Sequence, residues 1–412
     1  MTLAVDRLSG GPAQAAGELR APDRRVLAAA GLLLAGGMAA LGATFGWHLA
    51  TLYLLGGTFG LVLYHAGFGF SSAWRRFLGA GRGDGLRAQM LMLAVATAIF
   101  LPLLAQGSLF GQALGGAIAP LGVSVLVGAL LFGIGMQLGG GCASGTLYTV
   151  GGGSTRMVIT LVFFMVGSLI GSLHMPWWLA QPSFGSIGLL AALGLGPALT
   201  LQLGLFALLA YASVVIERRR YGGLGGARSV VRGWRRLLQG PWPLVWGAVA
   251  LALLNGVTLV LTGHPWSIAF GYTLWGAKAA SAAGLDVASW TFWTWPFPKQ
   301  ALAGSVFADG TSVMNFGIMA GAFLAAGLAG RFAPARRVPL GAALAAVAGG
   351  LLMGYGARLA FGCNVGALFS GIASGSLHGW LWLVAGLAGS YIGIWLRPLF
   401  RLDPVRTPPG GC

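Results

Sequence analysis

The chain has 412 residues, of which 57% are hydrophobic and 8% are charged, whereas an average soluble domain carries about 25% charged residues. This composition excludes a soluble globular domain, and long apolar stretches separated by arginine-rich turns exclude a β-barrel. The formal net charge of +17 comes from basic residues in short turns, where orientation in a membrane explains them without nucleic acid. We therefore expect an all-α polytopic membrane protein that does not bind nucleic acid.

Long apolar stretches recur along the chain and predict its membrane spans in order. Each has about the 20 residues that a helix needs to cross a bilayer. We expect ten spans, at 27–47, 50–66, 88–106, 117–138, 154–175, 187–213, 242–263, 303–330, 338–360 and 376–396. Four apolar pieces between them are too short to cross and predict re-entrant half-helices near 67–80, 142–150, 267–282 and 363–371.

The arginines predict the orientation of these spans. They cluster before the first span and after the second, at the start of the fifth, after the sixth, before the ninth and after the tenth. With ten spans every cluster falls on one side, which the positive-inside rule identifies as the cytoplasm, so both termini are expected there. The Trp-rich segment 265–298 then forms an interfacial belt on the other side. The apolar run from Val26 lacks a small-residue cleavage site, so we expect a span and not a cleaved signal peptide.

A duplication divides the chain into two halves. When the sequence is shifted by 221 positions, 128–147 falls on 349–368 with ten identical residues, all of them Gly, Leu or Cys. In the predicted topology the two copies enter the membrane from opposite sides, so they are inverted repeats with broken helices. We expect cytoplasmic tails at 1–26 and 399–412, a first repeat with an extra N-terminal span at 27–216, a basic cytoplasmic loop at 217–240 and a second, inverted repeat at 241–398.

Each copy places a cysteine at the start of a half-helix. Cys142 and Cys363 follow Gly141 and Gly362, which let the backbone turn tightly and approach a ligand. A half-helix that begins inside the membrane leaves N–H groups unpaired, and these favour an anion together with the helix macrodipole. Sulfur is polarizable, so two facing sites of this kind predict a soft, sulfur-bearing anion. The simpler alternative, that each cysteine is a small apolar residue, is weakened by the repetition.

Other cysteine chemistry is not indicated. The chain has three cysteines, too few for a disulfide framework, and no Cys/His spacing predicts a metal site. We expect no metal, no cofactor and no role for Cys412, which ends a Pro/Gly tail.

Two runs of residues carry a resemblance to a known family. The first is Phe-Gly-Ile-Gly from Phe132, continuing to Gly-Gly-Gly-Cys-Ala-Ser-Gly-Thr at Thr146; the second is Gly-Tyr-Gly from Gly354, continuing to Gly-Cys-Asn-Val-Gly at Gly366. They resemble the paired motifs of the YeeE/YedE family of sulfur-transport membrane proteins. The resemblance implies a thiosulfate importer, built as an hourglass of inverted repeats pinched between broken helices, whose pathway cysteines form weak S–H hydrogen bonds to the ion. It gives Cys142 and Cys363 the central positions of the two halves.

The chain departs from that family at one position. The family's N-terminal motif, usually Arg-Phe-Cys followed by small residues and Phe-Arg, aligns with 67–75, so that its cysteine is Gly69 here. One of three expected sulfurs is missing. Sulfite or a selenium oxyanion therefore stays open beside thiosulfate as the substrate.

A cation is expected to assist the thiols. Weak S–H donors alone would not hold a dianion in a low-dielectric path, so backbone N–H groups and one positive charge are needed. Arg358, five residues before Cys363 inside an apolar span, is the candidate, and its counterpart in the first copy is Gln137. The alternative is that Arg358 reaches the interface or pairs with a carbonyl and so holds the copies together.

Four other polar residues have weaker roles in this prediction. His65 and His264 occupy matching places in the two halves and could flank the entrances. Lys278 could attract an anion at the outer mouth. Asp309, near the start of a span, is either a helix cap or a proton-coupling group.

We therefore expect a multi-pass permease of the bacterial inner membrane, and not an enzyme, that takes up a small sulfur-containing anion through a midplane constriction. Its expected partners are the anion, membrane lipid and, as a further candidate, a cytosolic sulfur carrier or rhodanese-like protein. Two alternative functions, each from another class of protein, stay open. One is a sulfur-transfer protein in which either cysteine becomes a persulfide, although no general base lies near either in sequence. The other is a membrane scaffold that docks a soluble sulfur carrier on the basic loop.

Overall fold

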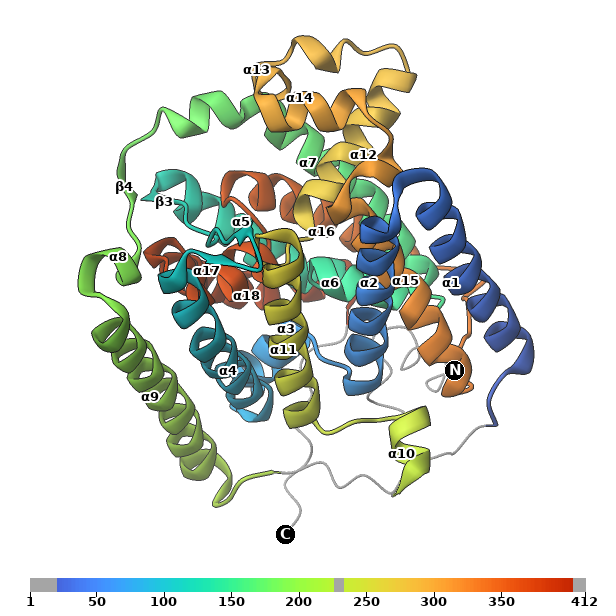
Figure 1. Ribbon diagram of the computed structural model, residues 1–412. Helices are drawn as coiled ribbons and strands as arrows, with labels where there is room; N and C mark the ends of the chain where they lie inside the picture. Colours follow the sequence, from blue (N-terminus) through green and yellow to red (C-terminus); the bar gives the residue numbers. More distant parts are fainter. Residues whose placement is uncertain (1–20, 226–232, 403–412) are drawn as a thin grey trace.

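The computed structural model describes residues 21–225 and 233–402, and its elements are almost all helices (Figure 1). The expected tails and the basic loop fall partly outside the described residues, and Cys412 lies outside them. The helices of the first half are α1 (Arg24–Phe45), α2 (Trp47–Ala66), α3 (Phe70–Ala80), α4 (Asp84–Gln106), α5 (Val123–Gly139), α6 (Ala143–Gly151), α7 (Thr155–Leu179), α8 (Leu189–Leu193) and α9 (Leu195–Tyr221).

The second half has the same order of long and short helices, with more turns outside the bundle. Its helices are α10 (Trp234–Gln239), α11 (Leu244–Thr262), α12 (Ala269–Ala282), α13 (Thr291–Thr294), α14 (Pro296–Ala303), α15 (Gly310–Leu328), α16 (Leu340–Leu359), α17 (Ser370–Ala373) and α18 (Leu377–Leu396). Three short 3-10 helices are η2 (Val287–Ser289), η3 (Val306–Ala308) and η5 (Arg397–Phe400), and η4 (Asn364–Phe369) is a six-residue π-helix. Two short antiparallel ribbons pair β1 (Ser108–Leu109) with β2 (Gln112–Ala113) and β3 (Pro120–Gly122) with β4 (Ser183–Ser186).

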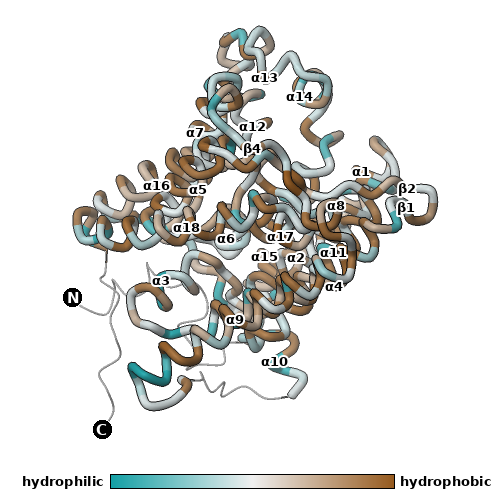
Figure 2. Tube along the Cα trace, turned by 90° about the vertical axis from the view of Figure 1, so that its left-hand side faces the viewer, coloured by the Kyte–Doolittle hydropathy of each residue, from teal (hydrophilic) through white to brown (hydrophobic). Residues whose placement is uncertain are grey.

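Ten helical stretches within the described ranges are long and apolar enough to cross a membrane, which confirms the predicted polytopic class. They contain, in chain order, α1, α2, α4, α5, α7, α9, α11, α15, α16 and α18, one for each expected span. Hydrophobic residues run along these helices, and hydrophilic residues gather at helix ends and connections (Figure 2).

Three spans begin six to eight residues later than hydropathy predicts, each for a local reason. Helix α5 begins only at Val123, because 120–122 form β3 and pair with β4. Helix α9 begins at Leu195, because Gly194 has a φ of +80° and separates it from α8. Helix α15 begins at Gly310, because the Asp309 carboxylate accepts the Ser312 N–H at 2.7 Å. Asp309 is therefore a helix cap.

The two halves pack as a pair related by two-fold pseudo-symmetry. Helix α16 packs along α7 and α5 along α18, just as α15 packs along α2 and α11 along α4. At the centre α5 and α16 cross each other with their glycines in contact. A Cβ on Gly128 would lie 2.7 Å from the Gly356 carbonyl oxygen, and one on Gly135 would lie 2.7 Å from the Gly349 carbonyl oxygen. Contacts in this order make the two equivalent helices antiparallel, as inverted repeats require.

A buried ion cluster fixes the end of α9 to the turn before α4. The Glu217 carboxylate is fully buried and accepts hydrogen bonds from Arg87 at 2.8 Å and Arg82 at 3.2 Å. The backbone N–H groups of Gly83 and Gly225 also donate to it, at 3.1 and 3.0 Å. Four donors balance the cost of burying this charge. The cluster therefore fixes the end of α9, from which the basic loop continues.

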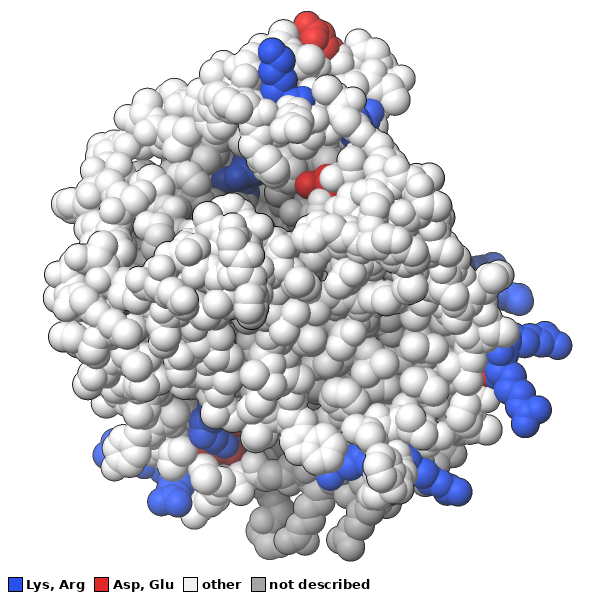
Figure 3. Space-filling model, viewed as in Figure 1, with Lys and Arg blue, Asp and Glu red and all other residues white. Residues whose placement is uncertain are grey.

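The two ends of the molecule differ in charge. Figure 1 shows α13 and α14 as a lobe at one end of the bundle, with α12 running from this lobe into the bundle. In Figure 3 most of the visible basic side chains lie on the lower part of the molecule, away from that lobe, and a hollow below the lobe holds one basic and one acidic residue. This distribution agrees with arginines that gather on one side of a membrane.

Candidate functional site

Cys142 and Cys363 occupy equivalent positions in the structure. Each is the residue that precedes a short helical segment: Cys142 precedes α6, and Cys363 precedes η4, which continues into α17. Their φ and ψ angles are −85° and −173° for Cys142 and −84° and −172° for Cys363. Both are fully buried. The repeat in the sequence is therefore also a repeat of backbone geometry at these two residues.

The glycines before each cysteine make the sharp turn that this geometry needs. Gly140 has a φ of +90°, in the left-handed region that side chains avoid. Gly362 has a φ of +152°, and a Cβ there would lie 2.8 Å from the Ala367 nitrogen. Phe361 adopts a φ of +57°, which is unusual for a bulky residue and marks local backbone strain before Cys363.

Each sulfur faces the first backbone N–H groups of its own short helix. The Gly145 N–H donates to Cys142 Sγ at 3.4 Å, and the Val365 N–H donates to Cys363 Sγ at 3.4 Å. The Ser144 hydroxyl also lies 3.4 Å from Cys142 Sγ. These are the N–H groups that a helix leaves unpaired at its start, and an anion beside the thiol would meet the same donors.

Tyr272 of α12 joins the two cysteine segments. Its hydroxyl donates to the Ala143 carbonyl at 2.9 Å, directly after Cys142, and its ring is close enough to interact electrostatically with both thiols. Its ring packs edge-on against Phe164 with centroids 4.5 Å apart. The segments themselves touch, since α6 contacts η4. Tyr272 lies inside the predicted half-helix 267–282, but nothing in its sequence context distinguishes it from the other aromatic residues there.

Aromatic side chains close the surroundings of the cysteines. Phe132, Phe164 and Trp382 are fully buried, and Phe132 contacts the other two, with centroid distances of 6.2 Å to Phe164 and 5.3 Å to Trp382. The Trp382 indole N–H donates to the Gly362 carbonyl at 3.3 Å, in the turn before Cys363. The structure therefore holds both thiols away from water.

Asn364, the residue after Cys363, has an amide with no partner among the described residues. It is fully buried, and neither its Nδ2 nor its Oδ1 makes a hydrogen bond. A buried amide without partners is costly, and such a group calls for an explanation. Its counterpart in the first copy is Ala143, so the second half alone carries this group. The sequence motif contains Asn364, but only its burial without partners points to a role.

Gln137 and Gly69 lie near the first half's cysteine segment. The Gln137 amide donates to the Ser71 carbonyl at 3.2 Å, and its Oε1 has no partner among the described residues. A Cβ on Gly69 would lie 3.5 Å from the Tyr148 hydroxyl of α6 and 3.3 Å from the Ser72 hydroxyl. Gly69 therefore faces the helix that begins at Cys142, and a small pocket opens beside it.

Arg358 faces a different part of the molecule. Its side chain packs on Gly171 of α7, with Cβ 2.8 Å from the position of an added Cβ there, and its guanidinium lies 4.8 Å from the centroid of the Phe292 ring. Its Nε has no hydrogen-bond partner in the described chain. These contacts place Arg358 between α7 and the outer lobe, and none of them involves a cysteine.

The other predicted polar residues separate into two ends of the molecule. The Lys278 ammonium donates to the Leu302 and Gly304 carbonyls, both at 2.5 Å, and so fixes the outer lobe. His264 is exposed beside Gly115, whereas His65 is buried at the end of α2. In the described ranges no group of three His, Cys, Asp or Glu side chains is placed to hold a metal ion.

The fold and the site together define a class of protein. Equivalent broken helices from two antiparallel repeats meet at buried helix starts, which is the architecture of secondary transporters. The chain belongs to the sulphur transport family, the YeeE/YedE family predicted from its motifs, because the family's sequence model matches residues 65–392.

Individual relatives agree with this membership. The chain is 29% identical to the thiosulfate transporter TsuA of Spirochaeta thermophila over 361 residues, which is 84% of this chain and 98% of that one. It is 25% identical to the thiosulfate transporter TsuA of Escherichia coli strain K12 over 355 residues, 83% of this chain and 93% of that one. The similarity to the probable transporter YedE of the same organism is 32% but spans only 170 residues, or 40% of the length of each protein.

Proposed function

We propose that this protein is a permease that takes up a small sulfur-containing anion, thiosulfate first, into the cytoplasm. The observation that carries the proposal is the pair of buried thiols at equivalent starts of two short helices, one from each half. The family and the two thiosulfate transporters among its relatives support the same class of cargo. The setting is the bacterial inner membrane, with both termini on the cytoplasmic side.

Each part of the site has a role in this proposal. Cys142 and Cys363 donate weak S–H hydrogen bonds, while the N–H groups at the helix starts provide most of the favourable electrostatics. Gly141 and Gly362 let the backbone approach the ion. Because both thiols are fully buried, the anion passes only when the aromatic side chains around them move.

Groups outside the constriction guide the ion. Arg358 raises the local concentration of anions on the side of the outer lobe, and Gln137 and Gly69 line the way onward from Cys142. No bond is made or broken, so the protein acts as a transporter and not as an enzyme. A soluble sulfur carrier or rhodanese-like protein would receive the ion at the basic loop, and lipid surrounds the apolar helices.

The direct test is uptake of sulfur-labelled thiosulfate by cells that lack their own uptake route and express this chain. We expect uptake well above that of cells with an empty vector, and competition by unlabelled thiosulfate. Stronger competition by sulfite or a selenium oxyanion would reassign the cargo, which the glycine at position 69 keeps open. Mass spectrometry that finds an added sulfur on either cysteine during turnover would favour the persulfide alternative.

A further inference from the structure

Tyr272 of α12 brings a hydroxyl donor from the second half to the cysteine segment of the first half. Its side chain is fully buried, and its hydroxyl donates to the Ala143 carbonyl at 2.9 Å, directly after Cys142. It is also close enough to interact electrostatically with the Cys363 thiol. One O–H group therefore lies near both sulfurs, in the region where the proposed path is closed.

The hydrogen bond from Tyr272 to Ala143 can be exchanged for another. Ala143 is the first residue of α6, and the carbonyl of such a residue also accepts the N–H four residues later in the helix. The Tyr272 hydroxyl is therefore an additional donor to an oxygen atom that keeps its helical partner. A hydrogen bond to an ionised acceptor is roughly twice as strong as one between neutral groups, so an anion beside Cys142 would compete for this hydroxyl.

The backbone that carries Tyr272 is fixed on both sides of this residue. Before α12 begins, the Asn315 amide donates to the Ile268 carbonyl at 3.1 Å. Three residues after Tyr272, the Trp275 indole N–H donates to the Ser312 hydroxyl at 2.9 Å. Both partners belong to α15, so α12 is held against that helix. The Tyr272 hydroxyl can therefore change its partner by a rotation of the side chain alone.

The first half has no hydroxyl at the equivalent place. Helices α3 and α12 are the equivalent half-helices, with Gly69 and Ile268 immediately before them. Tyr272 is the fourth residue of α12, and the fourth residue of α3 is Ala73. A phenol at this place therefore belongs to the second half alone, and the duplication does not account for it.

We propose that Tyr272 is the gate of the constriction and a direct ligand of the transported anion. In the closed state its hydroxyl donates to Ala143, and its ring packs edge-on against Phe164 with centroids 4.5 Å apart. When the anion reaches the thiols, the hydroxyl turns from the Ala143 carbonyl to an oxygen atom of the ion. The phenol then binds the oxygen-bearing end of the ion, and the polarizable sulfurs bind its sulfur. The proposal rests on the proposed transport function for the identity of the ion.

Removal of the hydroxyl alone tests the role of Tyr272 as a ligand. We expect Tyr272→Phe to raise the apparent KM for labelled thiosulfate at least about tenfold, which corresponds to about 1.4 kcal/mol. The matched control is Tyr53→Phe, because the Tyr53 hydroxyl also donates to a backbone carbonyl, that of Leu33 at 3.1 Å, between α1 and α2. Each variant loses one hydrogen bond of the same kind, so their unfolding temperatures should fall by similar amounts. An unchanged KM in the folded Tyr272→Phe protein would contradict the role as a ligand.

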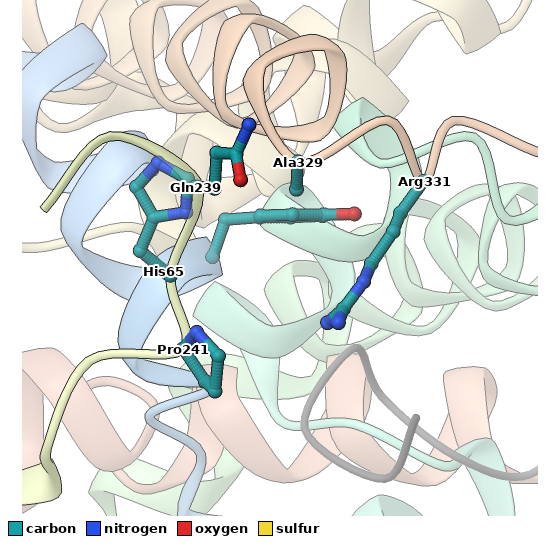
Figure 4. Close-up of a pocket in the computed structure, with 7 residues that line it drawn as sticks. His65, Gln239, Pro241, Ala329 and Arg331 are labelled. Carbon is teal, nitrogen blue, oxygen red and sulfur yellow. The ribbon is translucent and has the colours of Figure 1, made fainter. Parts of the chain in front are cut away.

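A second control lies at the other end of α6. Tyr64 lines a small pocket there, and Figure 4 shows His65 and Arg331 on opposite sides of this pocket. The Tyr64 ring packs against the end of α6, where a Cβ on Gly152 would lie 2.6 Å from Tyr64 Cε2. Tyr64→Phe therefore removes a buried hydroxyl beside the same helix but away from Cys142, and the KM should stay close to that of the parent. An equal rise in KM for Tyr64→Phe and Tyr272→Phe would assign the effect to packing around α6 and contradict the proposal.

The gate is tested by the accessibility of Cys142, which requires no transport. The purified protein carries Cys363→Ala and Cys412→Ala, so that Cys142 is its only thiol, and it is treated with a charged, water-soluble maleimide in the absence of thiosulfate. Because the hydrogen bond to Ala143 keeps the site closed, we expect Tyr272→Phe to be labelled about fivefold faster than the parent. Tyr53→Phe should be labelled at the rate of the parent. Equal rates for the two tyrosine variants would contradict the gate.

The two tests separate this proposal from the transport function. If the parent transports no thiosulfate but Tyr272→Phe still speeds the labelling of Cys142, the proposed cargo fails and the gate stands. If the parent transports thiosulfate and Tyr272→Phe changes neither the KM nor the labelling, the transport function stands and Tyr272 is only structural. If Tyr272→Phe does not fold, Phe164→Leu, which removes the ring that packs against Tyr272, should give the same faster labelling. Labelling of folded Phe164→Leu at the rate of the parent would then contradict the gate.

Discussion

Cys142 and Cys363 have the same backbone torsions to within 1° although they lie in opposite halves of the chain. Each sulfur accepts the N–H of a residue in the first turn of its short helix at 3.4 Å. Two duplicated segments therefore present a thiol in the same backbone geometry, with N–H groups of the first helical turn beside it, to one region of the bundle. An anion that passes between them would meet similar donors on both sides, which is what a path with two successive resting positions requires.

The unpartnered amide next to Cys363 predicts a residue that acts on the anion. Replacing Asn364 with Leu, of similar size, removes a buried group without hydrogen bonds and should raise the free energy of unfolding by roughly 1 kcal/mol. Uptake at low substrate concentration should nevertheless fall about tenfold, as expected when a hydrogen bond to a charged acceptor is lost. Thermal unfolding and labelled uptake measure the two effects. A less stable protein with normal uptake would make Asn364 purely structural.

The position of Arg358 predicts an effect on affinity and not on folding. The Arg358→Gln variant removes a charge between α7 and the outer lobe, so we expect the apparent KM for the anion to rise about tenfold while the maximal rate changes little. Arg337→Gln, exposed at the other end of the molecule, is the matched control. If the Arg358→Gln and Arg337→Gln variants had the same kinetics, Arg358 would have no role in transport and would only pack against Gly171 and Phe292.

The missing third sulfur can be restored. A Cβ on Gly69 would lie 3.3 Å from the Ser72 hydroxyl and 3.5 Å from the Tyr148 hydroxyl, and the residue has ordinary extended torsions. We expect Gly69→Cys to fold normally and to increase the preference for thiosulfate over sulfite about threefold, because a soft donor is added to the path. Competition between the two ions measures this preference. An unchanged ratio would show that position 69 does not contact the cargo.

The close crossing of α5 and α16 predicts that the glycines at this crossing are needed for the stability of the fold. An alanine Cβ at Gly135 would lie 2.7 Å from both the Gly349 oxygen and the Met353 nitrogen, so the helices must separate. We expect Gly135→Ala to lower the free energy of unfolding by about 1–3 kcal/mol. Gly204 of α9 has nothing within 4 Å, and Gly204→Ala should be neutral or stabilising by up to about 1 kcal/mol. Similar unfolding temperatures for the two variants would contradict the close crossing.

The sequence predicts the spans and the half-helices, because hydropathy can be read within each stretch of the chain, and it predicts the equivalence of the two cysteines, because identical residues recur 221 positions apart. It does not reveal Tyr272, because the place of this residue beside Cys142 depends on a contact between segments far apart in the chain. Arg358 shows the converse case, because its proximity to Cys363 in the sequence does not predict where its side chain points. Its distance from Cys363 is five residues in sequence, but the helix turns its side chain toward α7.

The central claim is that the anion passes between the two thiols. Uptake of sulfur-labelled thiosulfate is measured in cells without their own route that express the parent chain, the Cys142→Ala, Cys363→Ala double variant or the Cys412→Ala control, after each protein is shown to be folded and present in equal amounts. We expect uptake by the parent and the control and its loss in the double variant. Uptake by the folded double variant at the rate of the parent would contradict the claim.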